Sequence, residues 1–251
     1  MGFLDLASPL FSMLDGWISF LPETLRIILW ASVGAAVSMY LYLKLSAQDK
    51  IGTIKSDSVA ARKALSSYEG AEFDEMMPLA TRVLSLSGKH FIAVLGPAVL
   101  SSLPALALIV WASNQFGIVA PAAGTPVAVS VYPETAIVWS PKEAASSGET
   151  GTLVAWPESG AVVTASSDAG ELFVIGAGLA PVIHKKAWWN NLIGNPAGYL
   201  ADDSSIELVE IDMTYREFLP FGPDWLREWA GLFFIALLVV SIGIKVVFKI
   251  H

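Results

Sequence analysis

Few residues of this chain combine the type and the spacing that catalysis or metal binding requires. The three histidines, His90, His184 and His251, are widely separated and show no metal-ligand spacing. Asp202 and Asp203 precede an apolar run, where a capped turn explains the pair better than a cation site does. The sequence therefore predicts no metal and no other cofactor.

Ser241 and Lys245 lie one helical turn apart, which is the spacing of a Ser–Lys dyad. They occupy the end of a long apolar run, from which a lysine side chain extends to the membrane surface. The sequence contains no G-x-S-x-G, Walker or dinucleotide-binding motif. We expect that the chain is not an enzyme, so its function has to be sought in its larger elements.

Three apolar runs predict three transmembrane helices. The 251 residues are 54% hydrophobic and 15% charged, and the mean hydropathy is +0.58, which is too apolar for an ordinary soluble domain. About 20 helical residues cross the hydrocarbon of a bilayer. The predicted spans are residues 25–43, 91–113 and 226–248. The N-terminus lacks the basic region and cleavage site of a signal peptide, so we expect the first span to be a retained anchor.

The distribution of lysine and arginine predicts the orientation. Residues 1–25 contain no basic residue, whereas the segment between the first two spans contains seven. Basic loops stay in the cytoplasm, so this segment, residues 44–90, is expected there. The N-terminus and residues 114–225 then lie outside and the C-terminus inside, and a bacterial inner membrane is the expected location.

The segment between the second and third spans predicts a β-rich domain, a small sandwich or barrel. Residues 114–228 contain 14 Asp and Glu against 5 Lys and Arg, an acidic balance that excludes nucleic acid as a partner. Ser146–Gly151 and Ser166–Gly170 are expected to be exposed loops. The predicted strands, rich in Val, Ile, Thr and aromatic residues, are 127–132, 136–139, 152–156, 161–164, 171–175 and 206–213.

Residues 1–22 predict an amphipathic helix. Asp5, Ser8, Ser12, Asp15 and Ser19 follow helical spacing on one side, and the other side is apolar and includes Trp17. The polar side has no basic residue, so attraction to anionic lipid does not hold it at a membrane. Two interpretations remain: the apolar face is buried in the outer interface, or the helix packs on the outer domain as an ordinary amphipathic helix.

Residues 44–90 predict a helical hairpin. Its first arm has nearly heptad apolar spacing and ends at Gly70, and its second arm begins near Phe73 with acidic residues. Met76 and Met77 on the second arm form either an adaptable surface for apolar client segments or ordinary hairpin packing.

The second span contains helix-distorting residues, and all three spans contain small polar ones. Gly96, Pro97 and Pro104 predict a kink, because proline removes a backbone donor and crowds the preceding turn. The serines are either packing residues at close helix contacts or the lining of a mildly hydrophilic groove. The groove candidates are Ser32, Ser38, Ser101, Ser102 and Ser241.

Two adjacent tryptophans, Trp188 and Trp189, follow Lys185 and Lys186 in the outer domain. Tryptophan is frequent at membrane interfaces and in partner contacts, and it is equally common in cores. The sequence leaves these alternatives open.

The order of these segments resembles that of the YidC/Oxa/Get membrane-insertase superfamily, in particular its small archaeal and endoplasmic-reticulum members. The local similarities are Asp74-Glu75-Met76-Met77 before the second span and Leu219-Pro220-Phe221-Gly222 before the third, which ends in Lys245 and Lys249. The resemblance covers residues 1–116 and 219–251. The hairpin is short, the groove has no arginine, and the β-rich insertion is foreign to the small members.

The resemblance implies that the chain assists insertion or assembly of membrane-protein helices through a mildly polar groove. The alternative is a non-catalytic accessory subunit that docks on a larger membrane complex through its outer β domain. The partners are the lipid bilayer together with membrane-protein clients in the first case and fixed complex subunits in the second.

Overall fold

Three helices of the chain are long and apolar enough to cross a membrane, as the sequence predicted. The computed structural model describes residues 1–70, 72–148, 151–167, 170–176 and 178–249. The three helices are α2 (Glu23–Leu45), α4 (Phe73–Phe116) and α6 (Trp229–Val247). The chain forms two compact units, residues 1–27 with 107–233 and residues 28–106 with 234–251, which we call the β unit and the helical unit.

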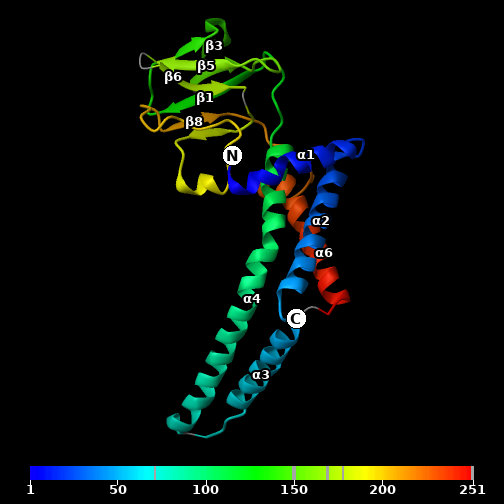
Figure 1. Cartoon of the computed structure of the whole chain (residues 1–251). Helices are drawn as coiled ribbons and strands as arrows, with labels where there is room; N and C mark the ends of the chain where they lie inside the picture. Colours follow the sequence, from blue (N-terminus) through cyan, green and yellow to red (C-terminus); the bar gives the residue numbers. More distant parts are fainter. Residues whose placement is uncertain (71, 149–150, 168–169, 177, 250–251) are drawn as a thin grey trace. The chain divides into compact units, whose positions relative to one another are not determined.

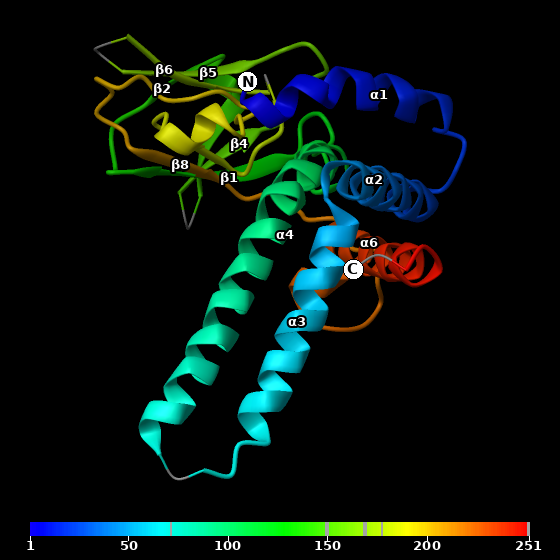
Figure 2. The same cartoon turned by 60° about the horizontal axis from the view of Figure 1, so that its bottom comes forward.

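The helical unit contains a helical hairpin. Helix α3 (Gln48–Ser66) runs beside the first half of α4 in both views (Figures 1 and 2). Arg62 Nη2 of α3 donates to Ser87 Oγ of α4 at 3.4 Å. Near the turn, the Tyr68 hydroxyl donates to Glu75 at 2.9 Å; desolvation and this hydrogen bond raise the pKa of Tyr68, which keeps the donor protonated.

Helix α4 is continuous over 44 residues and is not broken at its prolines, Pro78, Pro97 and Pro104. Proline lacks the N–H that would bond the carbonyl four residues earlier, so Pro97 and Pro104 leave the Ala93 and Leu100 carbonyls without their usual partners. The kink predicted at Gly96, Pro97 and Pro104 would therefore be a bend within a continuous helix. It stays a prediction.

The β unit contains two open antiparallel sheets. The larger has the strand order β3-β4-β1-β8-β7 and the smaller β2-β5-β6. Both sheets end in edge strands, so they do not close, and the barrel alternative was wrong. The strands are β1 (Pro126–Tyr132), β2 (Val138–Ser140), β3 (Ala145–Gly148), β4 (Gly151–Ala155), β5 (Val163–Ser167), β6 (Gly170–Ile175), β7 (Val182–His184) and β8 (Leu208–Ile211).

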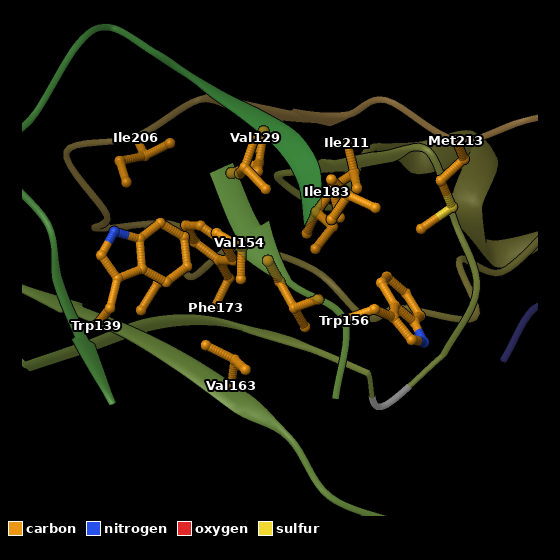
Figure 3. Packing of buried hydrophobic residues seen from close by; sticks show 14 of the residues in the cluster. Val129, Trp139, Val154, Trp156, Val163, Phe173, Ile183, Ile206, Ile211 and Met213 are labelled. Carbon is orange, nitrogen blue, oxygen red and sulfur yellow. The ribbon is translucent and has the colours of Figure 1, made fainter. Parts of the chain in front are cut away.

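The two sheets share one hydrophobic core. Val129, Val154 and Val209 of the larger sheet are at most 2% exposed, and they belong to the same buried cluster as Trp139 and Phe173 of the smaller sheet. The Trp139 and Phe173 rings meet edge to face at 5.8 Å (Figure 3). Two antiparallel sheets that bury their inner faces against each other form a sandwich.

Six of the eight strands overlap predicted ones, whereas β3 and β7 were not predicted. The expectation of a loop at Ser146–Gly151 was wrong for residues 146–148 and 151, which lie in β3 and β4, and residues 149–150 lie outside the described residues. Ser166, Ser167 and Gly170 likewise belong to β5 and β6, and residues 168–169 lie outside the described residues. Both unpredicted strands are short edges of the larger sheet. Pairing with one neighbour orders the Ala, Ser and Gly of β3, which have low β-propensity, and the three residues of β7, which are too few to form a recognisable pattern.

Shorter helices complete the β unit. A 3-10 helix, η1 (Phe3–Ala7), leads into α1 (Ser8–Trp17) at the N-terminus. The remaining helical turns are η2 (Lys142–Ala144), η3 (Trp188–Asn191) and α5 (Asp224–Arg227). Helix α1 thus occupies ten of the 22 residues predicted to be an amphipathic helix.

Candidate functional site

A cavity of about 500 Å³ lies among the helices of the helical unit and is the strongest candidate site. Its walls come from four different helices, so it depends on the packing of the whole unit. The lining combines six aliphatic or methionine side chains with four serines, three basic side chains and one tyrosine. The lining residues are Ala35, Ser38, Met39, Tyr42, Lys55, His90, Val94, Ala98, Ser101, Ser102, Ala105, Leu237, Ser241 and Lys245.

Four of the five predicted groove serines lie around this cavity: Ser38 of α2, Ser101 and Ser102 of α4 and Ser241 of α6. The fifth, Ser32, is not among the lining residues, and its hydroxyl donates to the Ile28 carbonyl at 2.7 Å within α2. Serines of three helices, up to 203 positions apart in the chain, therefore line the same cavity.

Ser101 and Ser102 satisfy their donors within α4. The Ser101 hydroxyl donates to the Ala98 carbonyl at 3.0 Å, and the Ser102 hydroxyl donates to the Val99 carbonyl at 2.8 Å. Pro97 and Pro104 leave the Ala93 and Leu100 carbonyls without a backbone donor, so the two serines do not replace the missing donors. A hydroxyl oxygen has two acceptor positions besides its O–H, so each serine can still accept a hydrogen bond at the cavity wall.

Ser38 differs from the other serines of the cavity. Its Oγ is buried, and no described residue donates to it or accepts from it. A buried hydroxyl without a partner costs about 1 to 3 kcal/mol, which a water molecule or a polar group of a bound segment would recover. The hydroxyl is therefore free to bind an occupant of the cavity.

One end of the cavity is basic. Lys55 of α3, His90 of α4 and Lys245 of α6 converge there, and the lining contains no Asp or Glu among the described residues. Tyr42 and Lys245 lie four residues after Ser38 and Ser241 on helices that run antiparallel to α4 (Figure 1). Along all three helices the order is thus from apolar residues, through serines, to Tyr42 or a basic side chain.

The other predicted site residues lie elsewhere. Gly96, Pro97 and Pro104 belong to α4 but do not line the cavity. Met76 and Met77 lie on the first turns of α4, 38% and 47% exposed, and Met77 lines a separate shallow pocket with Asp74, Pro78, Thr81, Arg82 and Ser85.

The three predicted interface tryptophans all belong to the β unit and differ in environment. Trp17 and Trp188 are 71% and 79% exposed. Trp189 is 43% exposed and packs against His184, with the ring centroids 5.2 Å apart. Trp188 thus points away from the domain, whereas Trp189 belongs partly to its packing.

Sequence reasoning missed the basic end of the cavity. Neither His90 nor Lys55 was assigned to the groove, and Lys245 was explained as a lysine that reaches the membrane surface. Each residue has an ordinary explanation by itself, and only the packing of α3, α4 and α6 brings them together. The sequence does show that Lys245 lies one helical turn after Ser241, which was already a groove candidate.

Comparison of the chain with protein-family models, with curated proteins and with solved structures finds no match.

Proposed function

We propose that this chain is an insertase-like membrane protein that assists the insertion or assembly of membrane-protein helices, and that the cavity of the helical unit binds the client. The observation that carries the proposal is the serine-lined cavity with the buried, unpartnered Ser38 hydroxyl. An exposed polar group in hydrocarbon costs several kcal/mol. Serine hydroxyls lower that cost because they accept and donate hydrogen bonds in place of water.

In the proposed orientation the basic end of the cavity faces the cytoplasm. Seven lysines and arginines from the end of α2 to the middle of α4 support this orientation. Lys55, His90 and Lys245 would then meet the flank of a client as it leaves the cytoplasm. Basic side chains in a low-dielectric site attract acidic groups strongly, so clients with an acidic flank are favoured.

The proposed orientation also assigns a role to the hairpin. The first half of α4 would extend into the cytoplasm, where Phe73, Met77 and Leu84 are 62%, 47% and 75% exposed. Exposed apolar residues of this kind mark protein-interaction surfaces. Met76 and Met77 would bind apolar client segments, since methionine adapts to differently shaped partners.

The first test changes the polarity of the cavity. The triple variant Ser38→Leu, Ser101→Leu, Ser102→Leu should remain folded and inserted but lose activity in a client-insertion assay, because leucine fills the cavity and removes its hydrogen-bonding groups. Ser32→Leu is the matched control, since Ser32 lies on α2 outside the cavity lining. If the serines are packing residues, overpacking at about 1 to 3 kcal/mol per site will instead lower the thermal stability of the triple variant in detergent, and the groove will have to be abandoned.

The second test identifies the occupant. A photo-crosslinking amino acid at Ser241 should capture varied nascent membrane proteins in cells, whereas the same residue at Val239, 63% exposed and outside the cavity lining, should not. Capture of a single protein in fixed ratio at Ser241 would favour the accessory subunit over the insertase. Equal capture at both positions would remove the cavity as the client site.

A further inference from the structure

The N-terminal segment of the β unit exposes a continuous apolar stripe. Its members follow each other at intervals of three and four residues through η1, α1 and the turn after it, which places them on one face of a helix. Each is more than half exposed, and none carries a charge or a hydrogen-bonding group other than the indole N–H of Trp17. The stripe consists of Phe3, Leu6, Leu10, Met13, Trp17 and Phe20.

Two residues on the polar side of the same segment are bonded to the rest of the β unit. Asp15 is 2% exposed and is paired with Arg26 through Nε at 3.0 Å and through Nη2. Trp111 Nε1 of α4 donates to Ser12 Oγ at 2.9 Å. At 100° per residue, Ser12 and Asp15 lie opposite the exposed stripe. A helix on the surface of a water-soluble protein has the reverse arrangement, with its apolar face inward.

The apolar surface continues onto the β domain. The Leu4 amide donates to the Leu192 carbonyl at 2.9 Å, and the Gly194 amide donates to Asp5 Oδ2 at 2.7 Å. These bonds join η1 to the segment after η3, beside the N-terminus in Figure 1. Helix η3 and that segment together add three exposed apolar residues, Trp188 (79%), Leu192 (49%) and Ile193 (41%).

We propose that the stripe together with Trp188, Leu192 and Ile193, which we call the apolar platform, is a membrane-docking site of the β unit that inserts into the headgroup–acyl boundary of one leaflet. Lipid suits this surface because acyl chains require no hydrogen bonds, whereas the rim of a protein–protein interface is polar. Helix α2, apolar enough to span a membrane, begins six residues after α1 ends, so the stripe already reaches the start of a span. Trp17 and Trp188 are of the residue type that is enriched at the headgroup level.

The stripe is expected to bind without regard to lipid charge. Residues 1–22 contain no lysine or arginine, so burial of apolar surface is its source of affinity. The proposal is independent of the client cavity, which belongs to the helical unit.

The test exploits the absence of cysteine from the chain. Full-length variants Leu10→Cys and Trp188→Cys, each labelled with a small thiol-reactive fluorophore, are reconstituted into phosphatidylcholine vesicles with and without brominated acyl chains. Both probes should lose most of their emission in the brominated vesicles. Ala123→Cys, at an exposed turn of the same unit, is the control and should keep its emission. Replacing part of the phosphatidylcholine with phosphatidylglycerol should leave all three results unchanged.

Three outcomes would overturn the proposal. Unquenched emission at Leu10 and Trp188, in protein that elutes as a single species, would show that the platform lies outside the bilayer. Quenching at Leu10 alone would show that η3 is not part of the membrane-docking surface. Quenching that appears only with phosphatidylglycerol would assign the binding to charge instead of apolar burial. Client-insertion activity enters none of these readouts, so failure here is distinguishable from failure of the proposed function.

Discussion

Arg26 is the first basic residue of the chain, and its guanidinium lies between a carboxylate and an aromatic ring. It pairs with Asp15, and its Cζ is 5.2 Å from the centroid of the Phe116 ring. The side chains of Arg26 and Asp15 are 10% and 3% exposed, so water screens neither charge well. Removing one member of such a pair leaves the other as a buried, uncompensated charge.

Asp15→Asn should therefore destabilise the β unit by about 3 to 5 kcal/mol, which thermal unfolding in detergent would measure. The matched control is Glu23→Gln, because Glu23 pairs with Arg216 at a partly exposed site and such pairs contribute about 1 kcal/mol or less. The double variant Asp15→Leu, Arg26→Met should recover much of the loss, since apolar replacement of a buried pair is often neutral. Equal effects of Asp15→Asn and Glu23→Gln would contradict a buried pair.

The sequence revealed the residue types of this site but not their pairing. Asp15 belongs to a polar stripe that helical spacing predicts, yet spacing does not say whether a polar stripe faces water or protein. That choice depends on Arg26, which lies eleven residues further along and beyond a turn, and on Trp111, which lies 99 residues from Ser12. The one indication of this pairing in the sequence was that no lysine or arginine precedes Arg26.

At the scale of elements, the β sandwich is held together by its inner faces. Phe173→Ala should lower the stability of the β unit by about 3 to 5 kcal/mol, because it removes a fully buried ring and leaves a cavity beside Trp139. Val138→Ala, next to Trp139 but 65% exposed on the outer face of β2, should cost less than about 1 kcal/mol. Chemical denaturation of the full chain followed by tryptophan fluorescence compares the two. Similar losses for both variants would contradict the assignment of inner and outer faces.

The elements that the sequence predicted best are those with the strongest periodic or compositional signal. Three long apolar runs gave α2, α4 and α6, and runs of Val, Ile and aromatic residues gave six of the eight strands. Strand β3 consists of Ala, Ser and Gly, and β7 has only three residues, so neither carries a pattern of its own. Their partners β4 and β8 order them, which is information that only the tertiary structure contains.

At the scale of the whole molecule, charge predicts topology. In intact cells, an impermeant thiol reagent should label Ala123→Cys and should not label Ser66→Cys, because the basic segment around Ser66 is expected in the cytoplasm. Both positions are exposed in the structure, so access within the protein does not bias the comparison. Disruption of the membrane should make Ser66→Cys reactive. Labelling of Ser66→Cys alone in intact cells would reverse the orientation, and with it the side at which clients enter.

The 44 residues of α4 make a helix about 66 Å long, since each residue adds about 1.5 Å, and the hydrocarbon of a bilayer occupies only about 30 Å of that length. With residues 91–113 in the membrane, Met76 and Met77 lie roughly 20 Å or more before its edge. Under the proposed function, the order of the sites along α4 is also the order in which a client reaches them. A client would meet the methionines first and the serine-lined cavity second, so capture would precede desolvation.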